Sequence, residues 1–140
     1  PTGAPAPNPR LARFRPPKVQ HPKVIVTEGS IDALSAAAAG YRAVAVLSAG
    51  YPDRSVAHAL SRLNHPLVIA FDPDDAGRQG ADELAQLLEA EMHPASVIDL
   101  EHGDMNDALR AAHDWERELP AQVDHATATP PSREALSINR

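Results

Sequence analysis

The chain has 140 residues, of which 43% are hydrophobic and 4% aromatic, a composition that suits one modest domain with an aliphatic core. It contains no cysteine, which excludes disulfides and cysteine-based zinc sites, and its formal net charge of −6 argues against a large basic face for nucleic acid. No run of about 18 apolar residues and no signal-peptide pattern is present, so we expect a soluble, cytoplasmic protein without membrane contact.

The first segment, residues 1–22, is predicted to be a linker or an extended arm. It holds seven of the 14 prolines, which remove backbone hydrogen-bond donors and prevent helix formation. Its basic residues are Arg10, Arg13, Arg15 and Lys18. They are interpreted either as charges of a solvated linker or as contacts for phosphates. The sequence begins with Pro instead of Met, so we expect a fragment or a processed product.

The central region, residues 23–115, alternates predicted strands and helices. Strands are expected over residues 24–27, 43–47, 67–71 and 96–100, and helices over 30–39, from 54 to about 63, 76–92 and 105–112. Parallel strands need crossover connections, which are right-handed. The pattern therefore predicts an α/β fold with an open, mainly parallel four-stranded sheet and helices on both faces.

The helix ends also carry signals. Ser30 and Asp75 are the predicted N-caps of the first and third helices, and Asp104 heads the last one. Gly40 is predicted to stop the first helix and Asn64 the second. The remaining residues, 116–140, are predicted to be a partly disordered extension, because Ala126–Arg140 is rich in Thr, Pro and Ser with little apolar periodicity.

Acidic side chains follow two of the predicted strands. Glu28 comes after residues 24–27, and Asp72 and Asp74 come after residues 67–71. Parallel strands end at one edge of the sheet, where open α/β folds bind ligands. Converging carboxylates suit Mg²⁺ or Mn²⁺, so we predict a metal site there; ordinary turn and capping chemistry is the alternative for Asp-Pro-Asp.

Gly29 and Asp32, which follow Glu28 in the chain, are interpreted separately. Gly29 is predicted to allow a sharp turn after the strand. Asp32 falls in the first turn of the first helix, where it either leans toward the same edge or only favours the helix dipole. Both interpretations of Asp32 stay open from the residues alone.

Four segments carry a resemblance to a known family. They are Glu28-Gly29-Ser30-Ile31-Asp32-Ala33-Leu34, Ala43-Val44-Ala45-Val46-Leu47, Phe71-Asp72-Pro73-Asp74-Asp75-Ala76-Gly77-Arg78 and Asp104-Met105-Asn106-Asp107-Ala108-Leu109. Together they resemble the Toprim domain in its bacterial and phage DNA-primase form, over about Val24–Leu109. The chain departs from that family at Pro73, where Gly is frequent, and it lacks the zinc-binding and basic subdomains of cellular primases.

The resemblance implies Mg²⁺-dependent nucleotidyl transfer in primer synthesis for DNA replication in a phage or plasmid. It implies that Glu28, Asp72 and Asp74 are catalytic and hold the metal together with Asp32. Arg78 would contact a phosphate, and Asp104, Asn106 and Asp107 would lie near the site. The expected partners are nucleoside triphosphates, a replicative helicase, and a single-stranded DNA template bound through other domains or the basic N-terminal arm.

Other functions stay open from the sequence. A Toprim nuclease would use the same acids to hydrolyse phosphodiesters, and a catalytically silent Toprim module would serve for docking. A phospho-acceptor receiver domain would need an acidic pair after the first strand and a late Lys, whereas this chain has Glu28 alone and no Lys after Lys23. For Arg78, a surface ion pair with Asp75 or Asp82 is the alternative.

Overall fold

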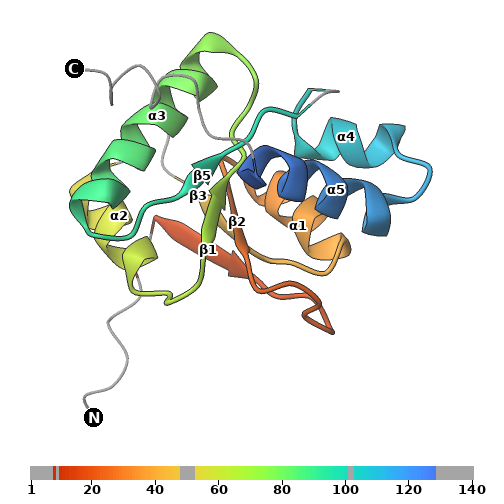
Figure 1. Cartoon of the computed structure of the whole chain (residues 1–140), viewed down its shortest axis with the longest axis horizontal. Coiled ribbons are helices and arrows are strands. Elements are labelled where there is room, and N and C mark those ends of the chain that lie inside the picture. Colours follow the sequence, from red (N-terminus) through yellow and green to blue (C-terminus); the bar gives the residue numbers. More distant parts are fainter. Residues whose placement is uncertain (1–7, 9, 48–52, 101–102, 129–140) are drawn as a thin grey trace.

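A five-stranded sheet lies between two groups of helices in the computed structural model, which describes residues 8, 10–47, 53–100 and 103–128 (Figure 1). The strands are β1 (Leu11–Phe14), β2 (Val24–Thr27), β3 (Arg42–Val46), β4 (Leu67–Ile69) and β5 (Ser96–Val97). Their order across the sheet is β1-β3-β2-β4-β5. β2, β3, β4 and β5 run parallel to one another and β1 runs antiparallel to β3, which confirms the predicted α/β class.

The helices cover both faces of the sheet, as predicted. They are α1 (Ser30–Ala38), α2 (Arg54–Ser61), α3 (Asp75–Ala90), α4 (Met105–Ala111) and α5 (Trp115–Ala128). Side chains alternate between the two faces of a strand, so β2 places Val24 and Val26 in the core under α2 and α3, and Ile25 in the core under α1, α4 and α5. Among the described residues, no helix is both long enough and apolar enough to cross a membrane.

Two elements lie in segments for which no element was predicted. β1 falls within the predicted linker and adds a fifth strand at the sheet edge, with Leu11 opposite Val46 and Phe14 opposite Ala43. α5 occupies the start of the predicted C-terminal extension, and it buries Leu119 and Val123 one turn apart. Residues 129–140 lie outside the described part of the chain.

The helix caps correct two expectations. Gly29, not Ser30, is the N-cap of α1, and it makes no side-chain cap. Its φ of −142° is extended backbone that any residue adopts, so the predicted need for glycine at a sharp turn is wrong. The two predicted helix stops agree with the structure: Gly40 and Asn64, with φ of 93° and 60°, follow α1 and α2.

Candidate metal centre

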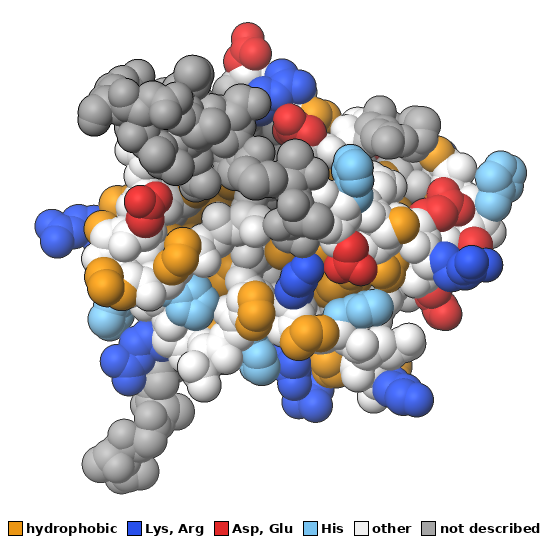
Figure 2. All heavy atoms as spheres, viewed as in Figure 1, with side chains coloured by type: hydrophobic (Ala, Val, Ile, Leu, Met, Phe, Trp, Pro, Cys, Tyr) orange, Lys and Arg blue, Asp and Glu red, His pale blue; other side chains and the backbone are white. Residues whose placement is uncertain are grey.

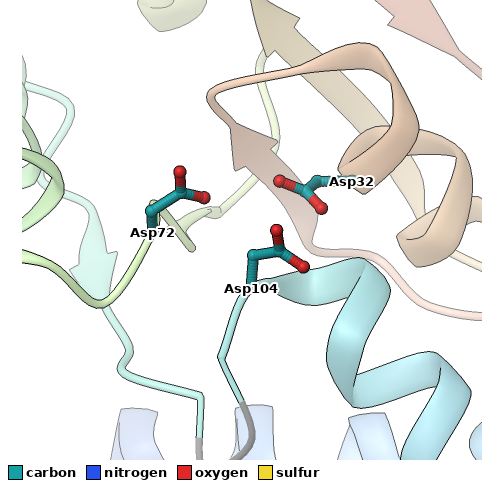
Figure 3. A group of neighbouring side chains, drawn as sticks. All are labelled: Asp32, Asp72 and Asp104. Atoms are coloured by element: carbon teal, nitrogen blue, oxygen red, sulfur yellow. The ribbon is translucent and has the colours of Figure 1, made fainter.

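Three aspartates from separate segments come together at the carboxyl edge of the sheet. Asp32 lies in the first turn of α1, Asp72 follows β4, and Asp104 is the N-cap of α4. One carboxylate oxygen of each lies within 4.8 Å of the other two, and Figure 3 shows the three groups turned toward a common space. Hard oxygen ligands at this spacing are the donor set that Mg²⁺ and Mn²⁺ prefer. We call Asp32, Asp72 and Asp104 the aspartate cluster.

The Asp104–Asp107 segment positions two members of the aspartate cluster. Asp104 Oδ1 accepts the Asp107 N–H at 2.8 Å, and Asp107 Oδ2 accepts the Asp104 N–H at 3.2 Å, which forms a capping box. The N–H of Asn106 donates to Asp32 Oδ1 at 3.0 Å. This segment therefore joins the start of α4 to the start of α1 and fixes Asp104 beside Asp32.

Glu28 links the ends of two strands. Its Oε1 accepts the backbone N–H of Asp72 at 2.7 Å, so the side chain that ends β2 holds the loop after β4. This hydrogen bond places Glu28 next to Asp72 without making it a member of the aspartate cluster. The four acids that sequence analysis assigned to the metal thus divide into Asp32 and Asp72, which lie in the cluster, and Glu28 and Asp74, which lie beside it.

Asp74 has a structural role that was predicted for its neighbour. Its Oδ1 accepts the Gly77 N–H at 2.7 Å, so Asp74 is the N-cap of α3 and the prediction of Asp75 as the cap is wrong. The cap needs extended backbone followed by three helical residues, and Asp74 has that backbone, with φ −102° and ψ 174°. Asp75 is the first residue of the helix and is exposed.

Burial and mutual repulsion make the acids of this edge harder to ionise. Burial is the main cause that raises the pKa of Asp32 to about 6, and the charge of Asp104 adds to it. Burial followed by the charge of Asp104 also raises the pKa of Asp72. The pKa of Glu28 is raised by burial first, and the charges of Asp72 and Asp74 oppose the lowering effect of its hydrogen bond from Asp72. The charge of Asp72 therefore acts on both groups of acids.

Replacing Asp32 with Asn is expected to raise the melting temperature of the metal-free protein at neutral pH. The pKa of Asp32 rises from 3.8 to about 6 on folding, so the folded state holds this proton more tightly. The stability that this proton gives the wild-type protein is therefore lost as the pH rises from 3.8 to about 6, and it is absent at higher pH. Asn escapes this loss, while its amide oxygen still accepts the Asn106 N–H. Because solvent screens the site, we expect a gain of only about 1 kcal/mol.

The measurement compares melting temperatures of wild type and Asp32→Asn across this pH range in the presence of a chelator. The two curves are expected to meet at the acidic end and to separate as pH rises. Curves that stay parallel over the whole range would contradict the assignment of the raised pKa to Asp32.

Gly77 lets the start of α3 approach the Asp72 backbone. A Cβ atom at this position would lie 2.0 Å from the Asp72 carbonyl oxygen, far inside any normal contact. Only glycine fits here, and the reason is space, since the residue is helical. The glycine of the Asp-Asp-Ala-Gly-Arg segment thus determines where Asp72 sits.

Arg78 lies near two exposed acids that are not members of the aspartate cluster. Its guanidinium is 3.9 Å from Asp75 and 3.8 Å from Asp99, and its side chain is 53% exposed. Arg78 and Asp72 line a small cavity of about 150 Å³ next to α3. The structure therefore shows the surface ion pair with Asp75 that was the alternative for Arg78, and the phosphate contact stays a prediction.

Asp104 is the residue that sequence analysis did not assign to the metal. It was predicted only to lie near the site, although it too comes after a predicted strand, the one over residues 96–100. The signal was weak because several residues separate Asp104 from β5, and its capping role explains its identity equally well.

Comparison with known proteins is consistent with this geometry. A family model described as Toprim-like matches residues 25–109 of the chain. A chain in a structure of bacteriophage T7 lagging-strand DNA polymerase interacting with primase domains of two gp4 subunits, bound to an RNA/DNA hybrid and dTTP, is 29% identical with a TM-score of 0.57, over 74% of this chain and 54% of that one. No curated protein sequence matches the chain.

Two further solved structures are similar. The primase fragment of the bacteriophage T7 primase-helicase protein is 31% identical with a TM-score of 0.53, over 72% of this chain and 43% of that one. The Aquifex aeolicus primase, with its zinc-binding and RNA polymerase domains, is 23% identical with a TM-score of 0.60, over 75% and 26%, and indicates the fold alone. The chain thus spans between 26% and 54% of the length of these matches.

Proposed function

The chain belongs to the Toprim-like family, and from this we propose that it is the catalytic Toprim domain of a DNA-primase-like protein that carries out Mg²⁺-dependent nucleotidyl transfer in primer synthesis. The observation that carries the proposal is the aspartate cluster, whose three carboxylates lie within 4.8 Å at the carboxyl edge of the sheet. The T7 structures support it, because one is a primase fragment and the other contains primase domains.

The residues of this site have different proposed roles. We assign Asp72 to the centre, with Asp32 and Asp104 completing the set that would hold the metal. A bound Mg²⁺ would supply positive charge for the phosphates of an incoming nucleotide and align them for attack by a 3′-hydroxyl. Asp74 adds its charge to the same edge and holds α3 in place as its cap.

Glu28 is proposed to act on Asp72 and on the proton of the attacking hydroxyl. Its hydrogen bond to the Asp72 N–H orients the loop that carries Asp72. Its raised pKa makes it a better proton acceptor than an ordinary Glu, whose affinity for a proton is low at neutral pH. Metal ligation by Glu28 is the other role open to it, and Glu28→Gln removes both.

The proposed partners follow from this function. Nucleoside triphosphates would bind at the aspartate cluster, with Arg78 as a candidate contact for a phosphate. A single-stranded DNA template would be held by other domains or by the basic residues of the N-terminal segment, and a replicative helicase is the proposed protein partner. This activity would place the protein in the cytoplasm, in phage or plasmid replication.

A template-directed assay tests the function directly. Incubated with single-stranded DNA, nucleoside triphosphates and Mg²⁺, the protein that contains this domain is expected to make short primers and to stop when a chelator is added. Cleavage of the strand without primer synthesis would favour the nuclease. Metal binding with neither reaction would favour the docking module.

Mg²⁺ or Mn²⁺ is expected to raise the melting temperature of the chain. The metal binds the folded aspartate cluster and relieves the repulsion among its carboxylates, so it stabilises by mass action, by about 2.7 kcal/mol at a hundredfold excess over Kd. This corresponds to a rise of about 5 °C or more for a domain of this size. Thermal melts followed by circular dichroism measure it.

Asp72→Asn and Asp75→Asn form the matched pair for this titration. Both remove one negative charge by the same chemical change, three residues apart, but only Asp72 belongs to the aspartate cluster. The metal response is expected to shrink in Asp72→Asn and to persist in Asp75→Asn. The same rise in both variants would mean that the metal binds elsewhere.

A further inference from the structure

A cavity of about 380 Å³ opens at the opposite edge of the sheet from the aspartate cluster. It lies at the beginnings of β2 and β3, whereas the acids follow the strand ends. Basic side chains from three segments line it, namely Arg13, Arg15, Arg42 and His65. Its apolar lining includes Val24, Val44 and Leu63. We call it the basic cavity.

The sheet register explains why arginines gather there. Arg13 lies opposite Val44, and Arg42 lies opposite Val24. Directly paired residues project from the same face of a sheet, and both valines belong to the core under α2 and α3. Arg13 and Arg42 therefore project from this face too, and Arg15 lines the same cavity from two residues further along the chain.

These arginines have no carboxylate partner among the described residues. Arg10 contacts Asp53, and Arg78 lies near Asp75 and Asp99, but no ion pair involves Arg13, Arg15 or Arg42. Carboxylates are not scarce, since the chain has 19 acidic residues and 13 basic ones. Figure 2 shows several separate Lys and Arg side chains in the lower half of the visible face. Like charges held together repel, and an anion would offset that repulsion.

We propose that the basic cavity binds the phosphate groups of a nucleotide unit, either a free nucleotide or one unit of a nucleic-acid strand. The planar guanidinium matches phosphate oxygens in paired hydrogen bonds, and three of them suit a multiply charged anion. The volume lies in the range of about 300–1,000 Å³ found for small-molecule sites. The choice of a nucleotide among phosphate esters rests on the proposed function, whereas the anion site rests on the arginines alone.

The test uses the chain without divalent metal, with ATP and a short single-stranded oligothymidylate as probes. Amide chemical-shift mapping by NMR is expected to show changes around Arg13, Arg15 and Arg42 in the wild type. In calorimetric titrations, the Arg15→Gln/Arg42→Gln double variant is expected to bind about tenfold more weakly or worse, with a smaller salt dependence. Arg110→Gln is the control, because Arg110 is an exposed arginine of α4 outside the cavity.

The outcomes separate the two sources of phosphate. Chemical-shift changes with ATP alone would mean that the basic cavity binds a free nucleotide, and changes with the oligonucleotide alone would mean that it binds a strand. Changes with both probes would mean that it binds the nucleotide unit that they share. Each of these results supports the proposal. If neither probe produces chemical-shift changes around the three arginines, the proposal is overturned. Equal weakening by Arg110→Gln overturns it as well, since the effect would then be one of net charge.

Repeating the titration with Asp72→Asn separates this site from the proposed function. Binding at the basic cavity is expected to survive that substitution. If the loss of Asp72 abolishes binding, the ligand sits at the acidic edge and the basic cavity is not its site, while the proposed function stands. If binding persists but primer synthesis is absent in the wild type, the basic cavity stands and the proposed function fails.

Discussion

Primer synthesis by the protein that carries this domain is expected to fall by about a hundredfold or more when Asp72 is replaced by Asn. Asp72 is the acid of the aspartate cluster whose charge also acts on Glu28, so replacing its carboxylate removes a charge felt by both groups at once. The loss affects the transition state, in which negative charge develops on the reacting phosphates, and such effects on rate reach about 100- to 1,000-fold for a single group. The assay is incorporation of labelled nucleotide on a single-stranded template.

The neighbouring acids serve as graded comparisons. Asp104→Asn is expected to reduce activity less than Asp72→Asn, because Asn still caps α4 and only the charge is lost. Asp75→Asn is expected to be nearly neutral, since Asp75 is exposed and is not part of the aspartate cluster. Activity that falls equally in Asp75→Asn and Asp72→Asn would show that the assigned centre is wrong. Activity unaffected by any of the three would exclude catalysis at this edge.

Gly77→Ala is expected to be strongly destabilising, although alanine normally favours a helix over glycine by up to about 1 kcal/mol. The added methyl would lie 2.0 Å from the carbonyl oxygen of Asp72, so either α3 or the loop after β4 must move. We expect a loss of about 3 kcal/mol or more, within the range for backbone strain and overpacking in a buried position. Urea unfolding of the metal-free chain measures this loss.

Gly80 provides the matched control one turn further along α3. A Cβ atom there would meet the ring of Phe71 at 3.6 Å, an ordinary contact, so Gly80→Ala is expected to be neutral or slightly stabilising. A variant Gly77→Ala that folds is also expected to lose the thermal response to metal, because Asp72 shifts with its backbone. Equal unfolding free energies for the two variants would refute the close approach of α3 to Asp72.

Local signals predicted much of this fold. The helix stops at Gly40 and Asn64, the start of the last helix at Asp104, and the acids at the strand ends all act within a few residues of one another. β1 was not predicted because a four-residue strand between prolines has little signal of its own, and its hydrogen bonds come from β3, about 30 residues away.

The candidate site was predicted in part for the same reason. Glu28, Asp32 and Asp72 follow from strand ends and helix starts, which the sequence marks. That Asp104 meets Asp32 depends on the packing of α4 against α1, and no short-range pattern encodes that contact. Whether Asp74 or Asp75 caps α3 depends on a shift of one residue in the backbone, which is smaller than sequence patterns resolve.

The indole of Trp115 has a consequence for how much chain this domain needs. Its Nε1 donates to the carbonyl of Ser35 at 2.7 Å, on the helix that carries Asp32, and Leu119 and Val123 continue the same buried face. Trp115 lies beyond residues 25–109, the part matched by the family, and β1 lies before it. The unit that folds is therefore larger than the unit that similarity defines. A fragment trimmed to the family boundaries would expose to solvent the side of α1 that packs against α5, and it would leave the outer edge of β3 without a partner strand.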